Sequence, residues 1–467
     1  MNHRITQAFD VCIVGGGIVG TALAASLSSS PFTAHLKVAL VEAGNLYSEP
    51  EIRPASFSNR VASVTPASMR LLNRIGAWDR IPADRKKAYT QMKVWDASGN
   101  GAIAFNAPMT HSASSIGWII ENDWLKSSLA QSLSSSVTVF NSSVVAGIES
   151  PAGSGSDWPV ISVNSDKGNG PTIQLKSRLL VGADGVNSLV RKYAGIESIG
   201  WDYPQKAVAA TLEIEGVEGN RNDVAYQRFL PTGPIALLPL AENKSSLVWS
   251  ASPAIAAKLL SLSAEDFAIF VDVAFRNPIE DLTYLLSRIQ PDGSLPKDLD
   301  LKAEAVWGQT RLETANTFKI GVPPSNTSLP RVVGVAEKSR AAFPLRFYLS
   351  DRYVSDHRVA LVGDAAHTVH PLAGQGLNLG LLDVATLTNV IEEGVQAGAD
   401  IGNIHTLQGY AAERFAPNLG MMMAIDSIGK LFRAESDPVV WARSFGLNLV
   451  NTLPGFKNLA MKAASTL

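Results

Sequence analysis

The stretch VCIVGGGIVGTALAASL, residues 11–27, places a buried-strand pattern, a glycine turn and a helix of small residues one after another. Gly15, Gly17 and Gly20 have the spacing GxGxxG. In a dinucleotide-binding unit the first glycine permits a tight turn, the second lets the backbone approach a pyrophosphate, and the third lets helix and strand pack closely. The unpaired N–H groups at the start of the helix favour an anion. The stretch therefore predicts a strand, turn and helix that hold dinucleotide phosphates.

The next segment completes a β–α–β unit. LKVALVEAG, residues 36–44, has the pattern of a second buried strand and contains Glu42 near its end. A carboxylate at this position accepts hydrogen bonds from the adenosine ribose hydroxyls and repels a 2′-phosphate. The unit therefore favours FAD or NAD over NADP. Because GxGxxG alone also occurs in structural turns, the prediction depends on both strands, the helix and Glu42 together.

Two later stretches repeat the arrangement of a buried strand followed by a glycine turn. GADGVNSLVR, residues 182–191, has Asp184 after a strand, and LVGDAAH, residues 361–367, has Gly363 and Asp364 at the start of a helix. An Asp-Gly pair is also a very common plain turn. A carboxylate at residue 364 would accept a hydrogen bond from a ribityl hydroxyl. Since the sequence has no second GxGxxG, one nucleotide unit must hold the working cofactor, which indicates a tightly bound flavin.

The stretch GDAAHTVHPLAGQGLNLG, residues 363–380, allows two interpretations. His367 and His370 have a spacing that a metal ion could use. The other residues let a planar ring lie against bare backbone, namely Pro371, Gly374, Gln375 and Gly376. Since proline and glycines make a poor rigid scaffold for metal ligands, we expect no metal here, and we expect the histidines to pack near the cofactor.

Composition excludes several classes of protein. The chain has 467 residues, 46% apolar and 18% charged, with a net charge of −2. It has no basic stripe of the kind that nucleic acid requires. One cysteine, Cys12, excludes an intrachain disulfide and a cysteine-rich metal site. No apolar run approaches the roughly 18–20 residues of a membrane-spanning helix, and residues 1–10 are too short and polar for a secretory or mitochondrial signal.

Periodicity outlines further elements. The patterns predict a helix within 63–81 entered through Thr65 and Pro66, a hairpin at 91–105, a strand and helix at 117–133, and antiparallel strands within 207–252. Residues 276–335 are rich in Pro, Asp and Ser, and we interpret them as an insertion or a long excursion. From about residue 378 the chain has helical patterns.

Together the three glycine-and-acid elements resemble the FAD-dependent aromatic hydroxylases, which are single-component flavoprotein monooxygenases. The match in order and spacing extends over nearly the whole chain. Further stretches are similar to the ubiquinone-biosynthesis hydroxylases, namely SNRVASVTPAS, MKVWDASG, IIENDWL, QRFLPTGPIALLPL, SLVWS and SRAAFPL. The insertion and the long C-terminal tail resemble the eukaryotic mitochondrial branch, whose members hydroxylate ring carbon five of a polyprenyl-hydroxybenzoate.

The resemblance implies an α/β fold in which an FAD-binding Rossmann-like domain of the glutathione-reductase type is joined to a second, mainly antiparallel β-sheet substrate domain and a helical C-terminal region. The implied FAD domain is discontinuous and comprises residues 1–85, 117–200 and 345–415. The substrate domain comprises 86–116 and 201–344, with the insertion at about 276–335, and the tail comprises 416–467. The sheet from roughly 205 to 255 is expected to cover the flavin face.

The resemblance also implies roles for single residues. Glu42 would bind the adenosine ribose, Arg60 the ribose and pyrophosphate region, and Asp364 the ribityl chain. Asp184 belongs to a motif linked to both FAD and a nicotinamide donor. The segment from His370 to Asn378 would border the isoalloxazine, with the backbone of Pro371 and Gly374 nearest the reacting position. The full set of expected cofactor-binding residues is Gly15, Gly17, Gly20, Glu42, Arg60, Asn122, Asp184, Gly363, Asp364, Gln375, Gly376 and Asn378; Asn122 stands where some relatives carry Arg or Gln.

The chemistry implied is hydroxylation of an electron-rich ring by O2 through a flavin C4a-hydroperoxide. The cofactor performs the difficult step, so no Ser/His/Asp triad or carboxylate pair is expected. Electrons would come from NAD(P)H or from a ferredoxin and its reductase. The partners implied are a polyprenyl-hydroxybenzoate-type substrate, O2 and other coenzyme Q biosynthesis proteins, without nucleic acid.

The implied location is the matrix side of the mitochondrial inner membrane, with a peripheral position on a bacterial membrane or in bacterial cytoplasm as the alternative. The tail has apolar residues at helical spacing, namely Ile425, Ile428, Leu431, Phe432, Trp441, Phe445 and Leu449. Its cations outnumber its acids and are Lys430, Arg433, Arg443, Lys457 and Lys462. Two interpretations remain: docking on an anionic membrane or partner, or helices packed on the FAD lobe.

Other functions on the same fold remain open. A prenyl reductase, an epoxidase or a halogenase would use the same cofactor site. A scaffold protein that binds flavin without turnover is a third hypothesis, although Glu42, Asp184 and Asp364 are all present.

Overall fold

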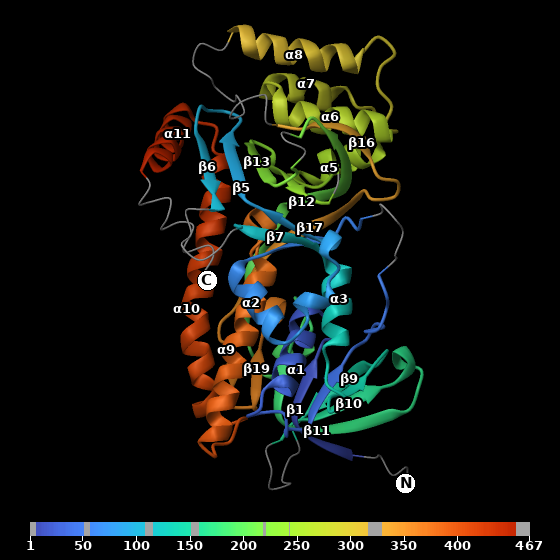
Figure 1. Ribbon diagram of the computed structural model, residues 1–467, viewed down its shortest axis with the longest axis vertical. Coiled ribbons are helices and arrows are strands. Elements are labelled where there is room, and N and C mark those ends of the chain that lie inside the picture. Colours follow the sequence, from blue (N-terminus) through green and yellow to red (C-terminus); the bar gives the residue numbers. More distant parts are fainter. Residues whose placement is uncertain are drawn as a thin grey trace.

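The structure is a computed structural model that describes residues 6–50, 57–107, 115–150, 158–217, 221–241, 243–315 and 329–453. The molecule is elongated, with two lobes stacked along its longest axis (Figure 1). The lobe at the bottom of that view contains the N-terminal strand. The lobe at the top contains the helices between residues 253 and 315.

The lower lobe is built on a sheet that is parallel at its centre. The strand order is β18–β19–β11–β1–β2–β8, and β10 and β9 extend β11 in antiparallel pairing. The strands are β1 (Thr6–Val14), β2 (Val38–Val41), β8 (Thr138–Phe140), β9 (Val144–Glu149), β10 (Val160–Asn164), β11 (Thr172–Gly182), β18 (Val354–Ser355) and β19 (Val359–Leu361). Val14 lies opposite Gly182, which lies opposite Leu361, so the parallel strands β1, β11 and β19 end level and their following turns share one edge.

Helices cover this sheet. They are α1 (Ile18–Ser29), α2 (Pro66–Arg74), α3 (Asn122–Gln131), α4 (Leu189–Tyr193), α9 (Gly376–Gln396) and α10 (Ile404–Arg433). Helix α1 packs against α9 and α3, and α9 packs against α10. The fully buried Ala22, Ala24 and Ala25 of α1 have small side chains, which lets this helix approach its neighbours closely.

The upper lobe is built on a mainly antiparallel sheet with the order β20–β17–β12–β15–β14–β13–β5–β6, and β16 pairs with β12. Its strands are β5 (Gln91–Asp96), β6 (Ala102–Asn106), β12 (Ser198–Glu215), β13 (Val224–Leu230), β14 (Gly233–Pro239), β15 (Lys244–Ala251), β16 (Arg331–Val335), β17 (Ala341–Ser350) and β20 (His367–Thr368). One face packs on helices α5 (Pro253–Ser261), α6 (Ala264–Arg276) and α7 (Ile279–Arg288), with Trp249 and Phe270 in the shared core. The other face is turned toward the lower lobe.

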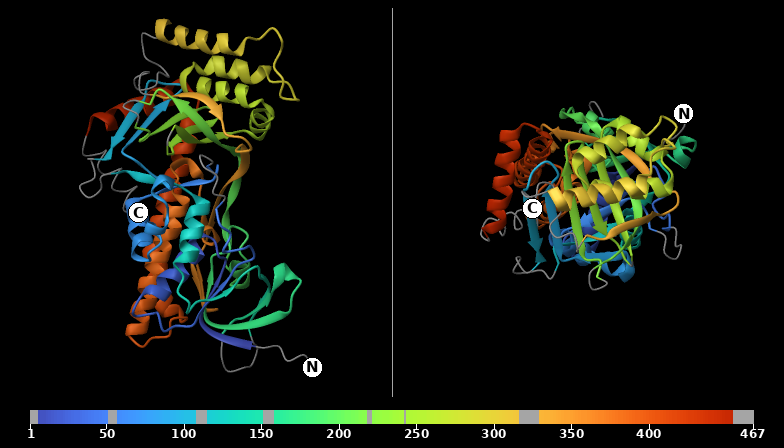
Figure 2. Two further views of the ribbon diagram at one scale, coloured as in Figure 1. Left: turned by 45° about the vertical axis from the view of Figure 1, so that its right-hand side comes forward. Right: turned by 90° about the horizontal axis from the view of Figure 1, so that it is seen from above.

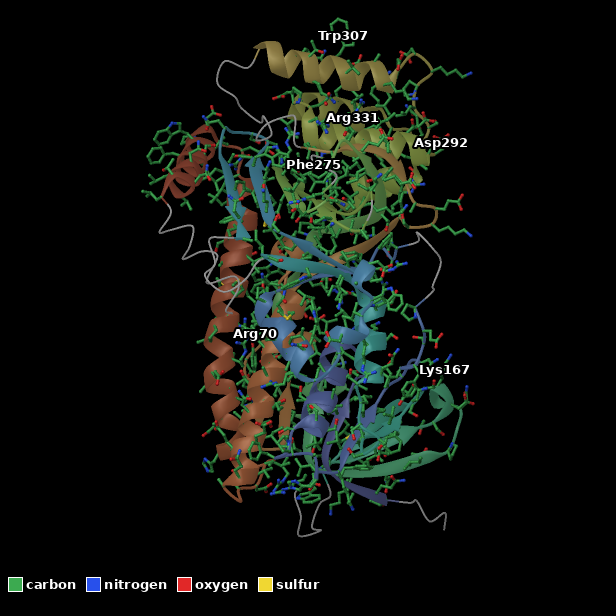
Figure 3. All side chains as sticks on the ribbon, viewed as in Figure 1. Arg70, Lys167, Phe275, Asp292, Trp307 and Arg331 are labelled. Carbon is green, nitrogen blue, oxygen red and sulfur yellow. The ribbon has the colours of Figure 1, made fainter. Side chains whose placement is uncertain are left out.

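Helix α8 (Leu301–Ala315) lies outermost in this lobe (Figure 2). Figure 3 shows Trp307 directed outward from α8, whereas Phe275 lies within the core below. The exposed fraction of Trp307 is 62% and that of Phe275 is 2%. The helices α7 and α8 therefore give regular structure to much of the segment 276–335, and residues 316–328 lie outside the described part.

A small sheet with the order β3–β7–β4 lies between the lobes (Figure 1). Its strands are β3 (Val61–Val64), β4 (Lys86–Tyr89) and β7 (Gly117–Glu121). At the C-terminal end, α10 runs along the lower lobe and reaches the upper one, where α11 (Asp437–Thr452) packs on β6. A buried ion pair joins this helix to the sheet, since Arg443 Nε lies 2.7 Å from Asp96 Oδ2.

The expected fold class is confirmed: an α/β lobe with a glycine-turn strand pair, a second mainly antiparallel sheet and a helical C-terminal region are all present. The helix expected at Pro66 begins there, and the Thr65 side chain caps it by accepting the N–H of Ser68. Within the described residues, no helix is both long and apolar enough to cross a membrane.

Candidate functional site

The turns after β1, β11 and β19 are in direct contact. The N–H of Ala183 donates to the carbonyl of Val14 at 2.8 Å, and the N–H of Val362 donates to the carbonyl of Gly182 at 3.0 Å. Gly15 has φ +105°, and a Cβ placed there would lie 2.3 Å from the carbonyl oxygen of Ala183. Only glycine therefore lets the first turn lie against the second.

The other two glycines of the first turn have different surroundings. A Cβ on Gly20 would lie 1.9 Å from the carbonyl oxygen of Gly15, so this glycine permits the close packing of α1 on the turn. A Cβ on Gly17 would meet nothing within 4 Å. Gly17 precedes α1 as its N-cap residue and lines an open space at the helix N-terminus. This is the geometry that a pyrophosphate requires.

Glu42 lies just beyond β2, beside the first turn. Its Oε2 accepts the N–H of Gly16 at 2.6 Å, and its Oε1 accepts the N–H of Gly44 at 2.6 Å. The carboxylate is therefore held at the edge of the glycine turn, where the adenosine end of a dinucleotide is expected.

The second turn carries Asp184 and is tied to the third turn by Arg191. Asp184 Oδ2 accepts the N–H of Leu189 at 2.7 Å, while Oδ1 is buried with no hydrogen-bond partner among the described residues. Arg191 Nη1 donates to the carbonyl of Ala365 at 2.9 Å, and its Nη2 donates to the carbonyl of Val186 at 2.6 Å. A single guanidinium thus fixes the spacing of the two turns.

The third turn places Asp364 on the cavity wall. Gly363 has φ +58°, and a Cβ there would lie 3.2 Å from Val19 of α1. The Asp364 carboxylate is accessible from the cavity but lies deep in the molecule, and this burial raises its pKa, with a smaller opposing effect of His367.

A buried carboxylate, Asp383 on α9, supports this turn. Its Oδ2 accepts the N–H of Gly363 at 3.0 Å and lies 2.5 Å from His367 Nε2. Its Oδ1 accepts Arg414 Nε at 3.1 Å and Asn418 Nδ2 at 3.0 Å. Burial alone would raise the pKa of Asp383, but His367, Arg414 and Asn418 outweigh it and the pKa is lowered. Helices α9 and α10 thereby hold the third turn in place.

The segment after this turn forms a compact loop. His370 Nδ1 accepts the N–H of Leu372 at 3.0 Å, and Gly374 has φ +61°. Asn378 is buried, and its Nδ2 donates to the carbonyls of Ser63 at 2.7 Å and Gly374 at 3.2 Å. Its side chain thus fixes the loop to β3 and does not face the cavity.

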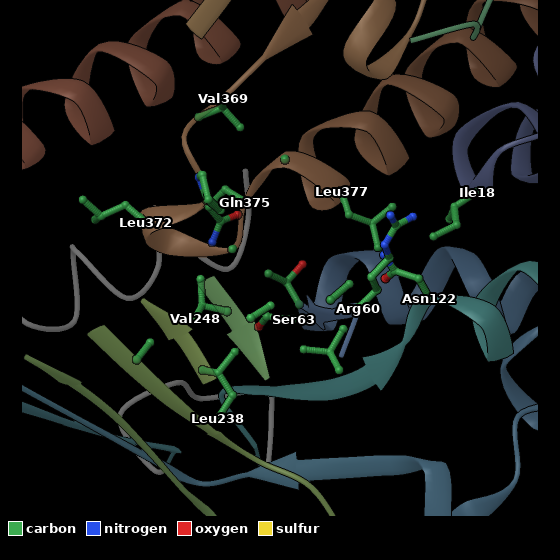
Figure 4. A pocket seen from close by; sticks show the side chains of 18 of the residues that line it. Ile18, Arg60, Ser63, Asn122, Leu238, Val248, Val369, Leu372, Gln375 and Leu377 are labelled. Atoms are coloured by element: carbon green, nitrogen blue, oxygen red, sulfur yellow. The ribbon is translucent and has the colours of Figure 1, made fainter. Parts of the chain in front are cut away.

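Arg60 and Asn122 meet at another wall. The N–H of Asn122 donates to the carbonyl of Arg60 at 2.9 Å. Asn122 Oδ1 is buried and has no partner among the described residues. Both side chains border the cavity (Figure 4).

These residues and the upper sheet enclose a cavity of about 900 Å3. Figure 4 shows its two sides: Val248 and Leu238 stand on the sheet of the upper lobe, facing the loop that carries Leu372 and Gln375. The expected site residues that line it are Gly17, Arg60, Asn122, Asp364, Pro371, Gly374, Gln375 and Gly376. The other expected residues lie in the turns and helices around it and do not line it, namely Gly15, Gly20, Glu42, Asp184, Gly363 and Asn378.

Sequence reasoning missed several residues of the site. Tyr89 and Ser63 line the cavity with hydroxyl oxygens 3.1 Å apart, and burial raises the pKa of Tyr89. Asp383 had one signal, since it is a lone acid in the apolar run LGLLDVATL. Gln227 lies on the side of the cavity formed by the upper sheet, which we call its floor. Its strand VAYQRFL carries several polar residues, and nothing in the sequence singles out Gln227 among them.

The residues present fit FAD. The open cradle at Gly17, the unpartnered Oδ1 of Asn122 and the cavity-facing Asp364 offer groups for phosphates and hydroxyls around one cavity. The loop around Gly374 offers backbone to a planar ring. Among the described residues, no group of three or more His, Cys, Asp or Glu side chains could hold a metal ion. Instead, His367 is engaged by Asp383.

Comparisons with known proteins agree with this geometry. The FAD-binding domain family matches residues 8–259 and 327–416. The ubiquinone biosynthesis monooxygenase COQ6 of Xenopus tropicalis is 40% identical over 98% of this chain and 93% of its own length. The human and Saccharomyces cerevisiae proteins of the same name are 37% and 38% identical, covering 98% and 96% of this chain and 92% of each relative.

Solved structures share the fold. p-Nitrophenol 4-monooxygenase PnpA from Pseudomonas putida has a TM-score of 0.65 at 17% identity, covering 99% of both chains. PqsL from Pseudomonas aeruginosa, described as a probable FAD-dependent monooxygenase, has a TM-score of 0.62 at 21% identity, covering 94% of this chain and all of that one. Full-length identity to curated relatives, with the three turns around one cavity, establishes that this chain belongs to the FAD-dependent ubiquinone biosynthesis monooxygenases.

Proposed function

We propose that this chain hydroxylates ring carbon five of a polyprenyl-hydroxybenzoate-type phenol. The proposal rests on the shared cavity. The glycine turns expected to bind the dinucleotide bound it on one side, and the mainly apolar face of the upper sheet bounds it on the other. The reaction balances as ring C–H plus O2, two electrons and two protons, giving ring C–OH and water. When bound, reduced FAD supplies the two electrons and activates O2.

The residues of the chain bind, orient and exclude water. Gly17, Glu42 and Asp364 would hold the dinucleotide, and the backbone around Pro371 and Gly374 would face its planar ring. Side chains of the floor, such as Ala236 and Val248, pack against the substrate ring and keep water away. Tyr89 keeps its proton at neutral pH, since burial raises its pKa, and it therefore acts as a hydroxyl and not as a base.

The test is product analysis with purified protein reconstituted with FAD. The flavin is reduced photochemically, and aerated buffer with a short-chain prenyl-hydroxybenzoate is then added. We expect one product with a single new hydroxyl at ring carbon five. Flavin reoxidation that forms only hydrogen peroxide, or a product with a reduced or epoxidised prenyl chain, would contradict the proposal.

We propose that a ferredoxin with its reductase delivers the electrons, as the resemblance to the mitochondrial branch implies. Anaerobic stopped-flow reduction tests this against NADH and NADPH in the same buffer. Flavin bleaching by the ferredoxin system at least about tenfold faster than by either nucleotide supports the proposal, and rapid bleaching by a nucleotide alone contradicts it.

We also propose a peripheral position on the matrix side of the mitochondrial inner membrane, with α11 as the contact. Its outer face carries Trp441, Phe445 and Leu449, four residues apart, with exposed fractions of 69%, 57% and 45%, and Leu453, 40% exposed, follows the end of the helix. This spacing forms one continuous apolar stripe on a helix. The relatives named above are described as mitochondrial.

Vesicle flotation tests this contact. Trp441→Ser with Phe445→Ser is expected to abolish flotation with anionic phospholipid vesicles, while Trp307→Ser on α8, equally exposed at the far end of the upper lobe, leaves it unchanged. Equal flotation of both variants would exclude α11 as the contact.

A further inference from the structure

Two polar side chains lie in the sheet floor of the cavity. Along a strand, successive side chains point to opposite faces of the sheet. Tyr226 on β13, Leu237 on β14 and Trp249 on β15 belong to the core shared with α5–α7. The residues next to them, Gln227 and Ser250, therefore face the cavity, which both of them line.

The pairing of the strands defines what surrounds them. Gln227 lies opposite Ala236, which lies opposite Val248, which lies opposite Ala209. All four residues line the cavity. They form one row across the strands, in which three alanine or valine side chains are followed by the amide of Gln227 at the end of the row. In the neighbouring row Ser250 lies opposite Ala207 and, by the same register, beside Pro234.

Neither polar side chain has a hydrogen-bond partner within the described part of the chain. Their exposed fractions are only 5% for Gln227 and 2% for Ser250. By contrast, the hydroxyls of Tyr89 and Ser63 are paired with each other, and the amide of Asn378 is fully engaged. Their polar atoms open onto the cavity. When a ligand fills the cavity and displaces its water, an amide left without a partner costs about 1–3 kcal/mol, so a ligand that pairs with it is favoured.

The floor also determines the charge of what it can bind. Among the described lining residues, the sheet of the upper lobe contributes no charged side chain. The cations of the lining, Arg60, Arg70 and Lys126, come from the region around β3, α2 and α3. An amide and a hydroxyl in an apolar floor suit an uncharged oxygen substituent, since the amide both donates and accepts.

We propose that Gln227 recognises the ring hydroxyl of the aromatic substrate and so selects the ring carbon that lies against the loop at Pro371–Gly374. This inference rests on the proposed function, because it assigns the polar group that orients the ring in the same cavity. The amide oxygen accepts the phenol O–H. Ser250 lies two strands away across β14 and in the neighbouring row, so it is too distant to share this hydroxyl.

The test compares two ligands on three variants of the FAD-loaded protein. The ligands are a short-chain prenyl-hydroxybenzoate and the same compound with hydrogen in place of the ring hydroxyl. The variants are Gln227→Leu, Ser250→Ala and the control Leu238→Met, which changes an apolar floor position of the same cavity. Dissociation constants come from the perturbation of the oxidised flavin spectrum, so no turnover is needed.

For Gln227→Leu we expect about tenfold weaker binding of the hydroxylated ligand and no more than about a twofold change for the other ligand. Ser250→Ala, a polar control on the same sheet, and Leu238→Met should each affect both ligands equally. Product from Gln227→Leu should contain more than one ring isomer. Equal losses for both ligands, or no loss, would overturn the inference.

Failure of the proposed function gives a different result. In that case the wild-type protein still binds the ligand with the ring hydroxyl more tightly than the ligand without it, but it forms no hydroxylated product. Gln227→Leu places an apolar side chain in a buried position, so it should fold. Gln227→Met, whose side chain is close to glutamine in length, provides the same comparison if it does not.

Discussion

At the scale of single residues, the glycines of the first turn serve different purposes and should respond differently to substitution. Gly17→Ala should fold normally, because a Cβ there meets nothing within 4 Å, but should raise the FAD dissociation constant about tenfold or more by filling the phosphate cradle. Gly20→Ala collides with the backbone at Gly15 and should lower the melting temperature instead. Flavin titration and thermal unfolding of both variants check this, and normal FAD affinity in Gly17→Ala would contradict it.

His370 should make stability depend on pH. Burial, with a contribution from Arg433, lowers its pKa to about 4 from 6.5. Between these two pKa values His370 is protonated in the unfolded chain but not in the folded chain. The folded state is therefore fully stable above pH 6.5, and its free energy of unfolding falls as the pH drops toward 4. Between pH 6.5 and 4.5 the loss should be about 2 kcal/mol.

Denaturant unfolding at the two pH values measures this loss. The control is His370→Asn, whose side-chain oxygen can still accept the N–H of Leu372 but does not titrate. The variant should lose about 2 kcal/mol less than the wild type over this interval. Identical pH profiles would show that His370 is not the group responsible.

Single residues also show the limit of sequence reasoning. Gly20 was predictable because its steric role follows from a contact with Gly15, five residues away. The spacing also marked Gly15 as a turn glycine, but its close contact is with Ala183 of the second turn. Asp383 and Gln227 were not predictable, because their importance comes from contacts with distant segments: Asp383 supports a turn in another element, and Gln227 faces the cavity only because of its register with β14.

At the scale of elements, α11 is attached to the upper lobe by one buried ion pair. Both Nε and Nη2 of Arg443 donate to Asp96, and Nη1 donates to three carbonyls between residues 431 and 434. Arg443→Met leaves Asp96 buried without its counter-ion and should cost about 3–5 kcal/mol. Adding Asp96→Asn should recover part of that loss.

Thermal unfolding and limited proteolysis of the tail measure this effect. Lys302→Ala, which removes an exposed ion pair with Glu265, is the control and should change neither readout. A melting temperature of Arg443→Met equal to that of the wild type would contradict the role given to the pair.

The same element shows why helices were easier to predict than their surroundings. The apolar spacing of the tail predicted helices, and α10 and α11 are present. Arg443 was grouped with the surface cations of the tail, but its side chain is only 1% exposed and paired with Asp96. Charge counting could not detect this, because the partner is hundreds of residues away in the sequence.

At the scale of the whole molecule, the cofactor should act as part of the fold, because in the proposed site it would join three turns that are far apart in the chain. FAD at about 100 times its dissociation constant should stabilise the protein by about 2.7 kcal/mol, and its removal should reverse this. Unfolding of the FAD-free protein with increasing FAD measures the effect. A melting temperature independent of FAD would contradict binding across the turns.

The general architecture was predictable because the three motifs end parallel strands and the carboxyl ends of such strands meet at one edge. The helices α7 and α8 were not predicted, since the composition of 276–335, rich in Pro, Asp and Ser, suggested only an insertion or a long excursion. The shape of the cavity was not predictable either, because it depends on how the upper sheet is placed over the loop at Pro371–Gly374.

The most direct test of the account is a single turnover under 18O2. The purified protein, loaded with FAD and reduced photochemically, is mixed with a short-chain prenyl-hydroxybenzoate and labelled oxygen, and the product is analysed by mass spectrometry. The account predicts one 18O atom in the new ring hydroxyl of each product molecule. A hydroxylated product without label, or complete flavin reoxidation with unchanged substrate, would contradict it.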